Sequence, residues 1–255
     1  MIWSPSCAAT WRTPLVRVGG MVDSLAHVPG GHLLNGRRLL YGLVALVAGG
    51  ILAFATLQPV KVMPRVRLAP GFLLVDQDGQ RLTSEDLRGQ IVLYSFLYTH
   101  CHSPDCDYII ETLRTVQDRL AEMDLGDTPV TLITISFDPE RDTPDVLRAY
   151  AQSVGADPQR WRFATGDPKR LKYIIGGGFE VYYKANEDGT FTFDPTFILV
   201  DGWGIIRAEY RYQTLVPDTE RILRHIGVVL KEVRNSKGAA RFAYEAAHLF
   251  LCYAH

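Results

Sequence analysis

The chain has 255 residues, of which 47% are hydrophobic and 22% are charged, an ordinary composition for a globular protein. Its formal net charge is −1 at pH 7. Because neither sign gathers into a basic block or an acidic tail, the charges give no support for nucleic-acid binding. The four cysteines are too few and too scattered for a disulfide scaffold. Only Cys101 and Cys106 lie close together, which indicates a local site.

An apolar segment without any charged residue, Leu39 to Leu57, is the first element along the chain. As a helix it would reach about 28 Å, roughly the hydrocarbon thickness of a bilayer. We therefore predict a transmembrane helix over 39–57. The run is longer than the apolar part of a typical signal peptide, and residues 58–61 lack the usual small-residue cleavage pattern, which favours an uncleaved anchor over a signal peptide or a buried core helix.

The flanks of this helix carry less information. Basic residues lie on both sides, so they leave the orientation of the helix open. Residues 1–36 contain Gly-Gly and Pro-Gly steps and no hydrophobic period, and we predict that they form a disordered tail. A linker with three prolines follows the helix.

Strand and helix signals alternate in the rest of the chain. Continuous apolar runs predict buried central strands at 91–98 and 130–137. Thr143 and Pro144 have the pattern of a helix cap followed by proline at the first helical position. The other predicted elements are short strands at 72–75, 81–82 and 161–163, a helical turn at 84–87, helices at 108–123, 168–175 and 218–233, glycines 176–178 ending the second of these helices, and a hairpin of 196–201 and 205–212.

This order predicts an α/β fold. Strands that alternate with helices, and then end in a hairpin and a closing helix, form a mixed sheet that is flanked by helices on both faces. The order is thioredoxin-like. In such a fold Cys101 lies just past a buried strand and near the start of the next helix, where unpaired amides and the helix dipole stabilise a thiolate. The position favours a reactive pair over an inert structural disulfide or two buried thiols.

Two motifs resemble those of the SCO/SenC family of membrane-anchored copper proteins. The first is Tyr98-Thr-His-Cys101 followed by Cys106, and the second, more specific one is Ser136-Phe-Asp-Pro-Glu-Arg-Asp-Thr-Pro144. The resemblance covers roughly residues 68–232. It implies a thioredoxin fold and a role in building the binuclear copper centre of cytochrome oxidase. It also implies a single-pass anchor in a bacterial inner membrane, a cytoplasmic tail over 1–36 and a periplasmic domain.

The resemblance further implies copper, as Cu(I) or Cu(II), held by Cys101 and Cys106. Its implied partners are the copper-bearing subunit of a terminal oxidase and the assembly factors of that subunit. Two departures from the family pattern affect this expectation. Four residues separate the cysteines here, where the family usually has three, and Phe193 occupies the place of the family's third copper ligand, a histidine. Thiolates suit Cu(I), whereas imidazole suits Cu(II).

Histidines beside the cysteines are candidates for the missing ligand. His102 lies inside the altered loop, and we name it as a possible third ligand next to Cys101 and Cys106. His100 is interpreted as a non-ligand, because the family motif often has this histidine without using it. Asp138 is a candidate for orienting the loop, although such a residue more often starts a turn, and residues 142–145 are expected mostly to cap the next helix.

The tail after Val233 lies outside the resemblance. Residues 233–255 are predicted to be an extension that contains an amphipathic helix. His248 and Cys252 are one helical turn apart, with His255 close behind, a spacing that suits a shared metal. A chance pairing on a docking helix is the favoured interpretation, because nothing else around these residues has ligand character.

Three functions from different classes follow from the sequence. The first is a copper-handling assembly factor that holds Cu(I) on Cys101 and Cys106 and passes it to cysteines of an oxidase subunit. The second is a copper-independent thiol-disulfide oxidoreductase, in which Cys101 attacks a partner disulfide and Cys106 resolves the mixed disulfide. The third is a scaffold module that docks through its C-terminal helix, which the intact cysteine pair disfavours.

Overall fold

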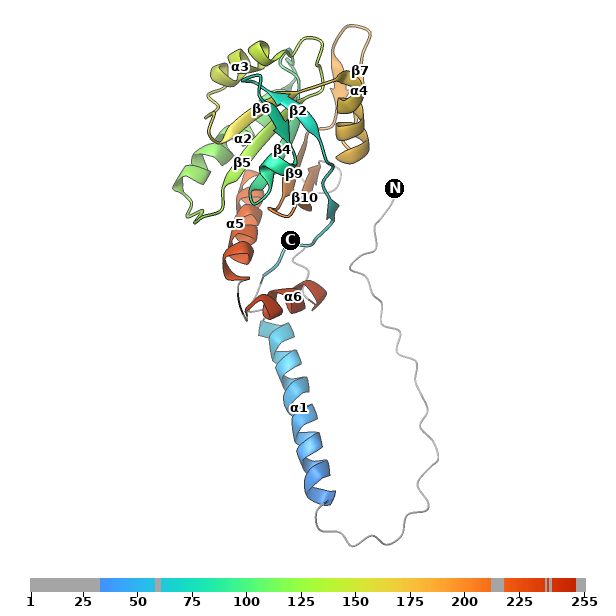
Figure 1. Cartoon of the computed structure of the whole chain (residues 1–255), viewed down its shortest axis with the longest axis vertical. Coiled ribbons are helices and arrows are strands. Elements are labelled where there is room, and N and C mark those ends of the chain that lie inside the picture. The colour runs from blue at the N-terminus through green and yellow to red at the C-terminus, as the bar shows by residue number, and fades with distance from the viewer. Residues whose placement is uncertain (1–32, 58–60, 212–217, 237, 239, 251–255) are drawn as a thin grey trace.

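A mixed sheet covered by helices forms the body of the protein (Figure 1). The structure is a computed structural model that describes residues 33–57, 61–211, 218–236, 238 and 240–250. Its eight-stranded sheet has the order β1-β10-β9-β4-β5-β6-β2-β3. The strands are β1 (Arg67–Leu68), β2 (Leu73–Asp76), β3 (Arg81–Thr83), β4 (Ile91–Leu97), β5 (Val130–Ser136), β6 (Trp161–Thr165), β9 (Thr196–Val200) and β10 (Ile205–Arg211).

Central strands β4, β5 and β6 are parallel, and β9 joins β4 antiparallel. Every residue of β4 and β5 is buried, as their continuous apolar runs predict. The helices are α2 (Pro104–Glu122), α3 (Pro144–Ser153), α4 (Pro168–Leu171), α5 (Thr219–Asn235) and α6 (Ala240–Phe250), with a single-turn helix η1 at Glu85–Leu87. The predicted thioredoxin-like order of a mixed sheet and flanking helices is confirmed.

Alternate residues of the strands face two different layers. One row across the sheet contains Phe197 and Phe163, and these rings contact Tyr108 of α2 and Tyr150 of α3. The other face of β4 presents Tyr94 and Phe96, whose rings both pack against Phe179. Both faces of the sheet are therefore covered by packed aromatic side chains. Polar side chains can gather at the ends of the central strands.

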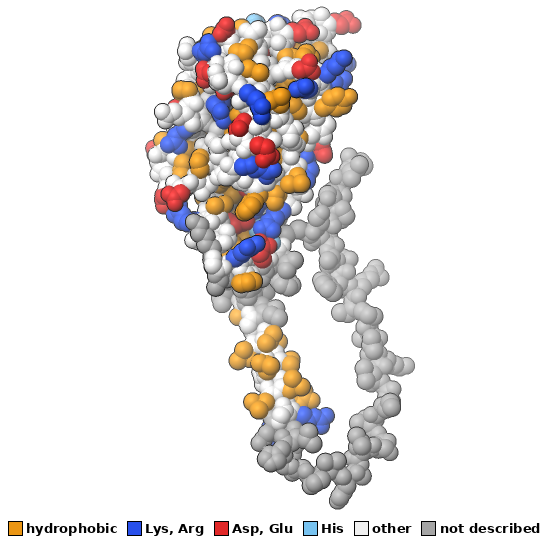
Figure 2. Space-filling view, in the orientation of Figure 1, with side chains coloured by type: hydrophobic (Ala, Val, Ile, Leu, Met, Phe, Trp, Pro, Cys, Tyr) orange, Lys and Arg blue, Asp and Glu red, His pale blue; other side chains and the backbone are white. Residues whose placement is uncertain are grey.

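Helix α1 (Leu33–Leu57) covers the predicted apolar segment and extends from the body (Figure 1). It begins at Leu33 instead of Leu39, so the last residues of the predicted tail are helical, and residues 1–32 lie outside the described part. Hydrophobic side chains line its visible surface, whereas the body shows mixed charges (Figure 2). In the ranges that the structure describes, no helix combines the length and the apolar character that crossing a membrane requires.

Two local predictions need correction. Helix α2 begins at Pro104, earlier than the predicted Tyr108, because extended Ser103 precedes a proline at the first helical position. The helical segment does not stop before the glycines at 176–178 but continues through them as a π-helix, η2 (Lys172–Gly178), which ends at Gly178. Glycine is needed there for close approach, since a Cβ on Gly178 would lie 2.5 Å from the Pro70 side chain.

A short hairpin that the sequence analysis missed lies between η2 and β9. Its strands β7 (Tyr183–Ala185) and β8 (Phe191–Phe193) form a separate two-stranded sheet. At the other end of the chain, α6 is shorter than the predicted extension, and Cys252 and His255 lie outside the described residues. The hairpin carries Phe193, the residue at the position of the family histidine.

Candidate functional site

Cys101 and Cys106 form a disulfide, with Cα atoms 6.2 Å apart. Cys101 lies in the loop after β4 and is half-buried, and its Sγ atom is 3.3 Å from Ser103 Oγ. Cys106 lies in the first turn of α2 and is only 2% exposed. The two sulfurs therefore differ in access, and a partner can reach Cys101 more easily than Cys106.

The start of α2 gives the pair its chemical character. Amides in the first helical turn lack partners within the helix, and with the helix dipole they stabilise a nearby thiolate after reduction. Asp105 and Asp107, exposed in the same turn, add negative charge that opposes thiolate formation and attracts cations. Burial, aided by the carboxylates of Asp107 and Asp142, raises the pKa of neighbouring Tyr150 to about 12, so this phenol stays protonated near neutral pH.

A buried carboxylate joins the two strand ends beside the cysteine loop. Asp142 is fully buried and accepts hydrogen bonds from the backbone N of Thr99 at 3.0 Å and from Thr99 Oγ1 at 2.5 Å. The hydroxyl of Ser136, at the end of β5, donates to the same carboxylate at 2.5 Å. The prediction that residues 142–145 cap α3 is confirmed, with Thr143 at the cap position and Asp145 in the first turn, but the Asp142 carboxylate binds the strand ends instead.

Asp138 orients a neighbouring loop. Its carboxylate accepts a hydrogen bond from Arg141 Nε at 2.5 Å, and the same guanidinium donates to the carbonyl of Gly189 in the β7–β8 turn. The sequence analysis considered Asp138 as a residue that orients the cysteine loop. The structure instead connects it, through Arg141, to the hairpin that carries Phe193.

Phe193 fills the family histidine's place with a buried ring. It is 7% exposed, and its ring centroid lies 5.1 Å from that of Phe137 and 6.3 Å from that of Tyr98. Tyr183 of the same hairpin stacks on Phe137, and the Phe191 ring packs against Phe137 at a tilt. An aromatic cluster thus occupies the position from which a third ligand would come.

The residues around the disulfide fit a thiolate-bound soft ion better than a three-ligand copper site. His102, the predicted third ligand, is exposed on the loop. Throughout the described ranges, no group of three or more His, Cys, Asp or Glu side chains has a geometry that could hold a metal ion. After reduction, the two sulfurs alone suit Cu(I), whereas Cu(II) would lack the imidazole that it prefers.

His100 has a defined hydrogen-bond partner instead. Its Nδ1 atom is 3.1 Å from Thr99 Oγ1 and 3.8 Å from Asp142 Oδ1, although the side chain is 54% exposed. Because the only hydroxyl proton of Thr99 is donated to Asp142, Nδ1 of His100 must be the donor in their contact. Asp142 therefore orders the two residues that precede Cys101.

His248 contacts a carboxylate of the neighbouring helix. Its Nε2 atom lies 2.8 Å from Glu232 Oε1, on the neighbouring helix α5. Glu232 also accepts a hydrogen bond at 2.6 Å from Arg207, a buried residue that the sequence analysis did not single out. Burial alone would raise the pKa of Glu232, but hydrogen bonds from His248 and Arg207 outweigh it and lower that pKa.

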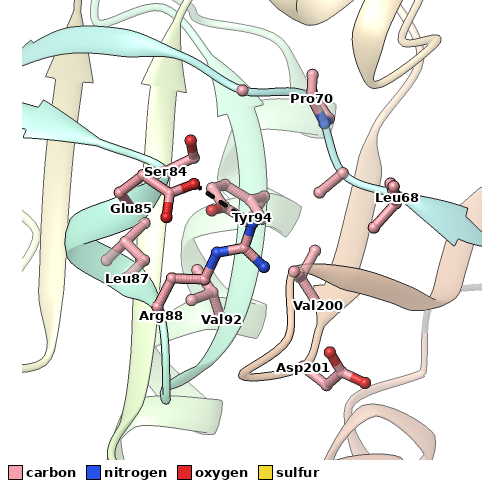
Figure 3. A pocket seen from close by; sticks show the side chains of 13 residues that line it. Leu68, Pro70, Ser84, Glu85, Leu87, Arg88, Val92, Tyr94, Val200 and Asp201 are labelled. Atoms are coloured by element: carbon pink, nitrogen blue, oxygen red, sulfur yellow. Dashed lines mark hydrogen bonds and ion pairs between the residues drawn. The ribbon is translucent and has the colours of Figure 1, made fainter.

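A small cavity of about 110 Å³ lies at the opposite end of β4 from the cysteines (Figure 3). Leu68 and Pro70 line one wall, while Arg88 and Tyr94 face them across the opening, and Arg88 is paired with Glu85. Its lining contains no cysteine or histidine. The thiol pair therefore remains the candidate functional site.

Comparisons with known proteins show what this chain is similar to. The SCO1/SenC family model matches residues 61–231. The mitochondrial SCO2 homolog of Homo sapiens is 34% identical over 184 residues, which cover 67% of this chain and 66% of that protein. A SCO2-like protein of Rickettsia prowazekii is 29% identical over 126 residues, covering 49% of this chain. The match spans 57% of that relative's length, little more than half.

Solved structures have the same fold. A SCO1/SenC family lipoprotein from Bacillus anthracis superposes with a TM-score of 0.60 at 23% identity, over 67% of this chain and 99% of that one. Arabidopsis thaliana ScoI, solved with copper bound, gives a TM-score of 0.55 at 26% identity and covers 66% of this chain and 98% of its own. Because the family model matches well over half of the sequence, this chain belongs to the SCO1/SenC family.

Proposed function

We propose that this protein assists assembly of the copper centre of a respiratory cytochrome oxidase, and that it acts on partner cysteines by thiol-disulfide exchange. The observation that carries the proposal is the Cys101–Cys106 disulfide, which has one accessible and one buried sulfur. Membership of the SCO1/SenC family supports the part of the proposal that concerns assembly of the oxidase copper centre. Phe193 in place of a third ligand favours redox chemistry over tight copper storage.

The exchange transfers two electrons to the partner. In the reduced protein, the Cys101 thiolate attacks a sulfur of the partner disulfide, forms a mixed disulfide and releases one partner thiolate. Cys106 then attacks the Cys101 sulfur, which closes the Cys101–Cys106 disulfide and releases the second partner thiol. An external dithiol reductant must restore the starting state. The partner ends with two reduced cysteines, the form in which it can bind copper.

Anchoring by helix α1 is part of this proposal. Its support is the lack of charged residues from Leu39 to Leu57 and the exposure of large apolar side chains such as Leu39, Leu43 and Leu46. We place the anchor in a bacterial inner membrane, with residues 68–232 in the periplasm, where oxidase copper centres are assembled. Reporter fusions at both ends of the chain test this topology. A cytoplasmic signal from the C-terminal fusion would contradict it.

Trapping tests the exchange. The full chain with Cys106→Ser, incubated with an oxidised peptide that carries a Cys-x-x-x-Cys copper motif, should accumulate a mixed disulfide at Cys101 because the resolving thiol is absent. Wild type should instead release reduced peptide, and Cys101→Ser should form no adduct. Adducts that form equally at Cys106 in the Cys101→Ser variant, or no reduction of peptide by wild type, would refute the exchange role.

Copper(I) carriage is the second candidate, favoured by the two adjacent sulfurs at a helix start. Here the reduced pair holds Cu(I) and transfers it by ligand exchange to thiolates of the oxidase subunit. Anaerobic titration of the reduced chain against a moderate Cu(I) chelator tests it. We expect Cu(I) binding that is lost in Cys106→Ser and unchanged in His102→Ala. Binding that the chelator abolishes in wild type would eliminate this candidate.

A further inference from the structure

We propose that Asp142 is a positioning residue that holds the Cys101-bearing loop over Cys106 and thereby stabilises the disulfide. The inference deepens the proposed function, since it concerns the same thiol pair. It starts from where the chain leaves the sheet. Leu97 and Ser136 are paired at the ends of parallel strands β4 and β5, and the cysteine loop begins directly after the first of them. In the described residues, the last backbone hydrogen bond between the two strands runs from Phe137 N to the carbonyl of Leu97, before the loop begins.

Asp142 supplies the missing restraint. One of its oxygens accepts from the backbone N of Thr99 and from Ser136 Oγ, so it connects the loop to the end of β5. The other oxygen accepts from Thr99 Oγ1. The carboxylate thus fixes both the backbone and the side chain of a residue two positions before Cys101.

The restraint is rigid because the carboxylate is itself held firmly. Asp142 is completely buried, and its backbone N donates to the carbonyl of Asp138 at 2.9 Å. Hydrogen bonds to an ionised acceptor are stronger than those between neutral groups, and breaking one in a buried place leaves a costly unpaired donor. Movement of Thr99 away from Asp142 would break both hydrogen bonds between the two residues at once.

Holding one end of the loop favours disulfide closure. Cys106 is buried on α2, so the closing reaction depends on how often the Cys101 sulfur lies within reach of it. A fixed Thr99 limits the positions open to Cys101 and raises the effective concentration of one thiol at the other. Loss of the restraint should therefore make the disulfide easier to reduce.

The test is the equilibrium between the Cys101–Cys106 disulfide and a reference dithiol, measured on the full chain in detergent. For Asp142→Ala we expect the equilibrium to shift about ten-fold toward the reduced protein, within the range that supporting groups contribute at other preorganised sites. This corresponds to about 30 mV for a two-electron couple. Thr99→Val, which keeps the backbone donor and loses the hydroxyl, should shift it in the same direction by less, and Thr99→Ser should restore the wild-type value.

Asp76→Ala is the matched control. Asp76 is also a buried carboxylate, 4% exposed, but it accepts from backbone N atoms of Asp78 and Gln80 in the turn between β2 and β3. The Asp76→Ala substitution should lower the denaturation midpoint and leave the dithiol equilibrium unchanged. An Asp142→Ala shift of less than two-fold, or one as large in the control, would overturn the proposal. If Asp142→Ala does not fold, Thr99→Val against Thr99→Ser decides the question.

This measurement is independent of the proposed function. The reference dithiol is a small molecule, so the equilibrium can be read even if wild type fails to reduce the partner peptide. A failed peptide reaction with a shifted equilibrium in Asp142→Ala would remove the exchange role and keep the positioning role. A working peptide reaction with no shift of the dithiol equilibrium in the variants would keep the exchange role and remove the positioning role.

Discussion

Buried carboxylates lie at both ends of the central sheet, but they are satisfied in different ways. Near the cysteines, Asp142 accepts hydrogen bonds from the hydroxyl and backbone donors of Thr99 and from the Ser136 hydroxyl. At the start of β4, Asp201 and Glu232 both bind the guanidinium of Arg207, at 2.9 and 2.6 Å. The first network restrains one loop, whereas the second neutralises charges in the interior.

The second network also joins segments that are distant in sequence. Arg207 of β10 donates to the carbonyls of Met63 and Pro64 in the linker as well as to Glu232 of α5. Glu232 in turn binds His248 of α6. The difference between the two ends indicates that Arg207 maintains the fold, while Asp142 maintains the site. Variants at each end should therefore separate stability from thiol chemistry.

Arg207→Ala should have the largest effect on stability. It would leave two buried carboxylates without their cation, and breaking a buried ion pair from one side typically costs about 3–5 kcal/mol. Denaturant unfolding of the full chain measures this loss. The dithiol equilibrium of the variant, taken where it is still folded, should match that of wild type. A shifted equilibrium would show that the two ends are coupled.

His248→Ala should cost less, about 1.5 kcal/mol, because it removes one hydrogen bond to a charged acceptor. The effect should be local, with faster hydrogen exchange at amides of α6 and unchanged exchange in β4 and β5. Glu245→Gln is the control on the same helix. Glu245 pairs with Arg65 at 3.1 Å on the surface, and such exposed pairs contribute about 0–1 kcal/mol after solvent screening. Equal losses of stability in the two variants would contradict a stabilising hydrogen bond between His248 and Glu232.

Acid should weaken the same network by the smallest amount. The pKa of Glu232 is lowered in the folded protein, so its stabilising contribution is present above its unfolded value near 4.5 and is lost as the pH falls through the lower folded value. The free energy of unfolding should therefore decrease from pH 5 downward more steeply in wild type than in Glu232→Gln. Parallel pH profiles would mean that other carboxylates dominate acid unfolding.

Much of the fold follows from local sequence patterns. The buried strands β4 and β5 are continuous apolar runs, and a cysteine directly after the first of them predicts a site at a strand end. The errors come from contacts between distant segments. The glycines before Phe179 were interpreted as a helix stop, but Gly178 is required by the packing of Pro70, more than a hundred residues away in sequence.

The same limitation applies to the site. Both cysteines were predicted, and the family position of Phe193 was located by counting along the sequence. The role of Asp142 was missed because its partner Thr99 is 43 residues away, and an acidic residue before Thr-Pro has the local pattern of a helix start. His102 is exposed on the cysteine loop, and its role as a third ligand stays a prediction.

The placement of Cys106 has a consequence for how the protein would signal its redox state. Its helix is anchored in the core by Ile109, Leu113 and Val116, all fully buried. When the disulfide opens, the Cys106 side cannot move without disturbing that core, so any displacement falls on the exposed loop around His102. A partner that contacts this loop would therefore bind a different loop surface in each oxidation state. The surface of the rest of the domain would be the same in both states.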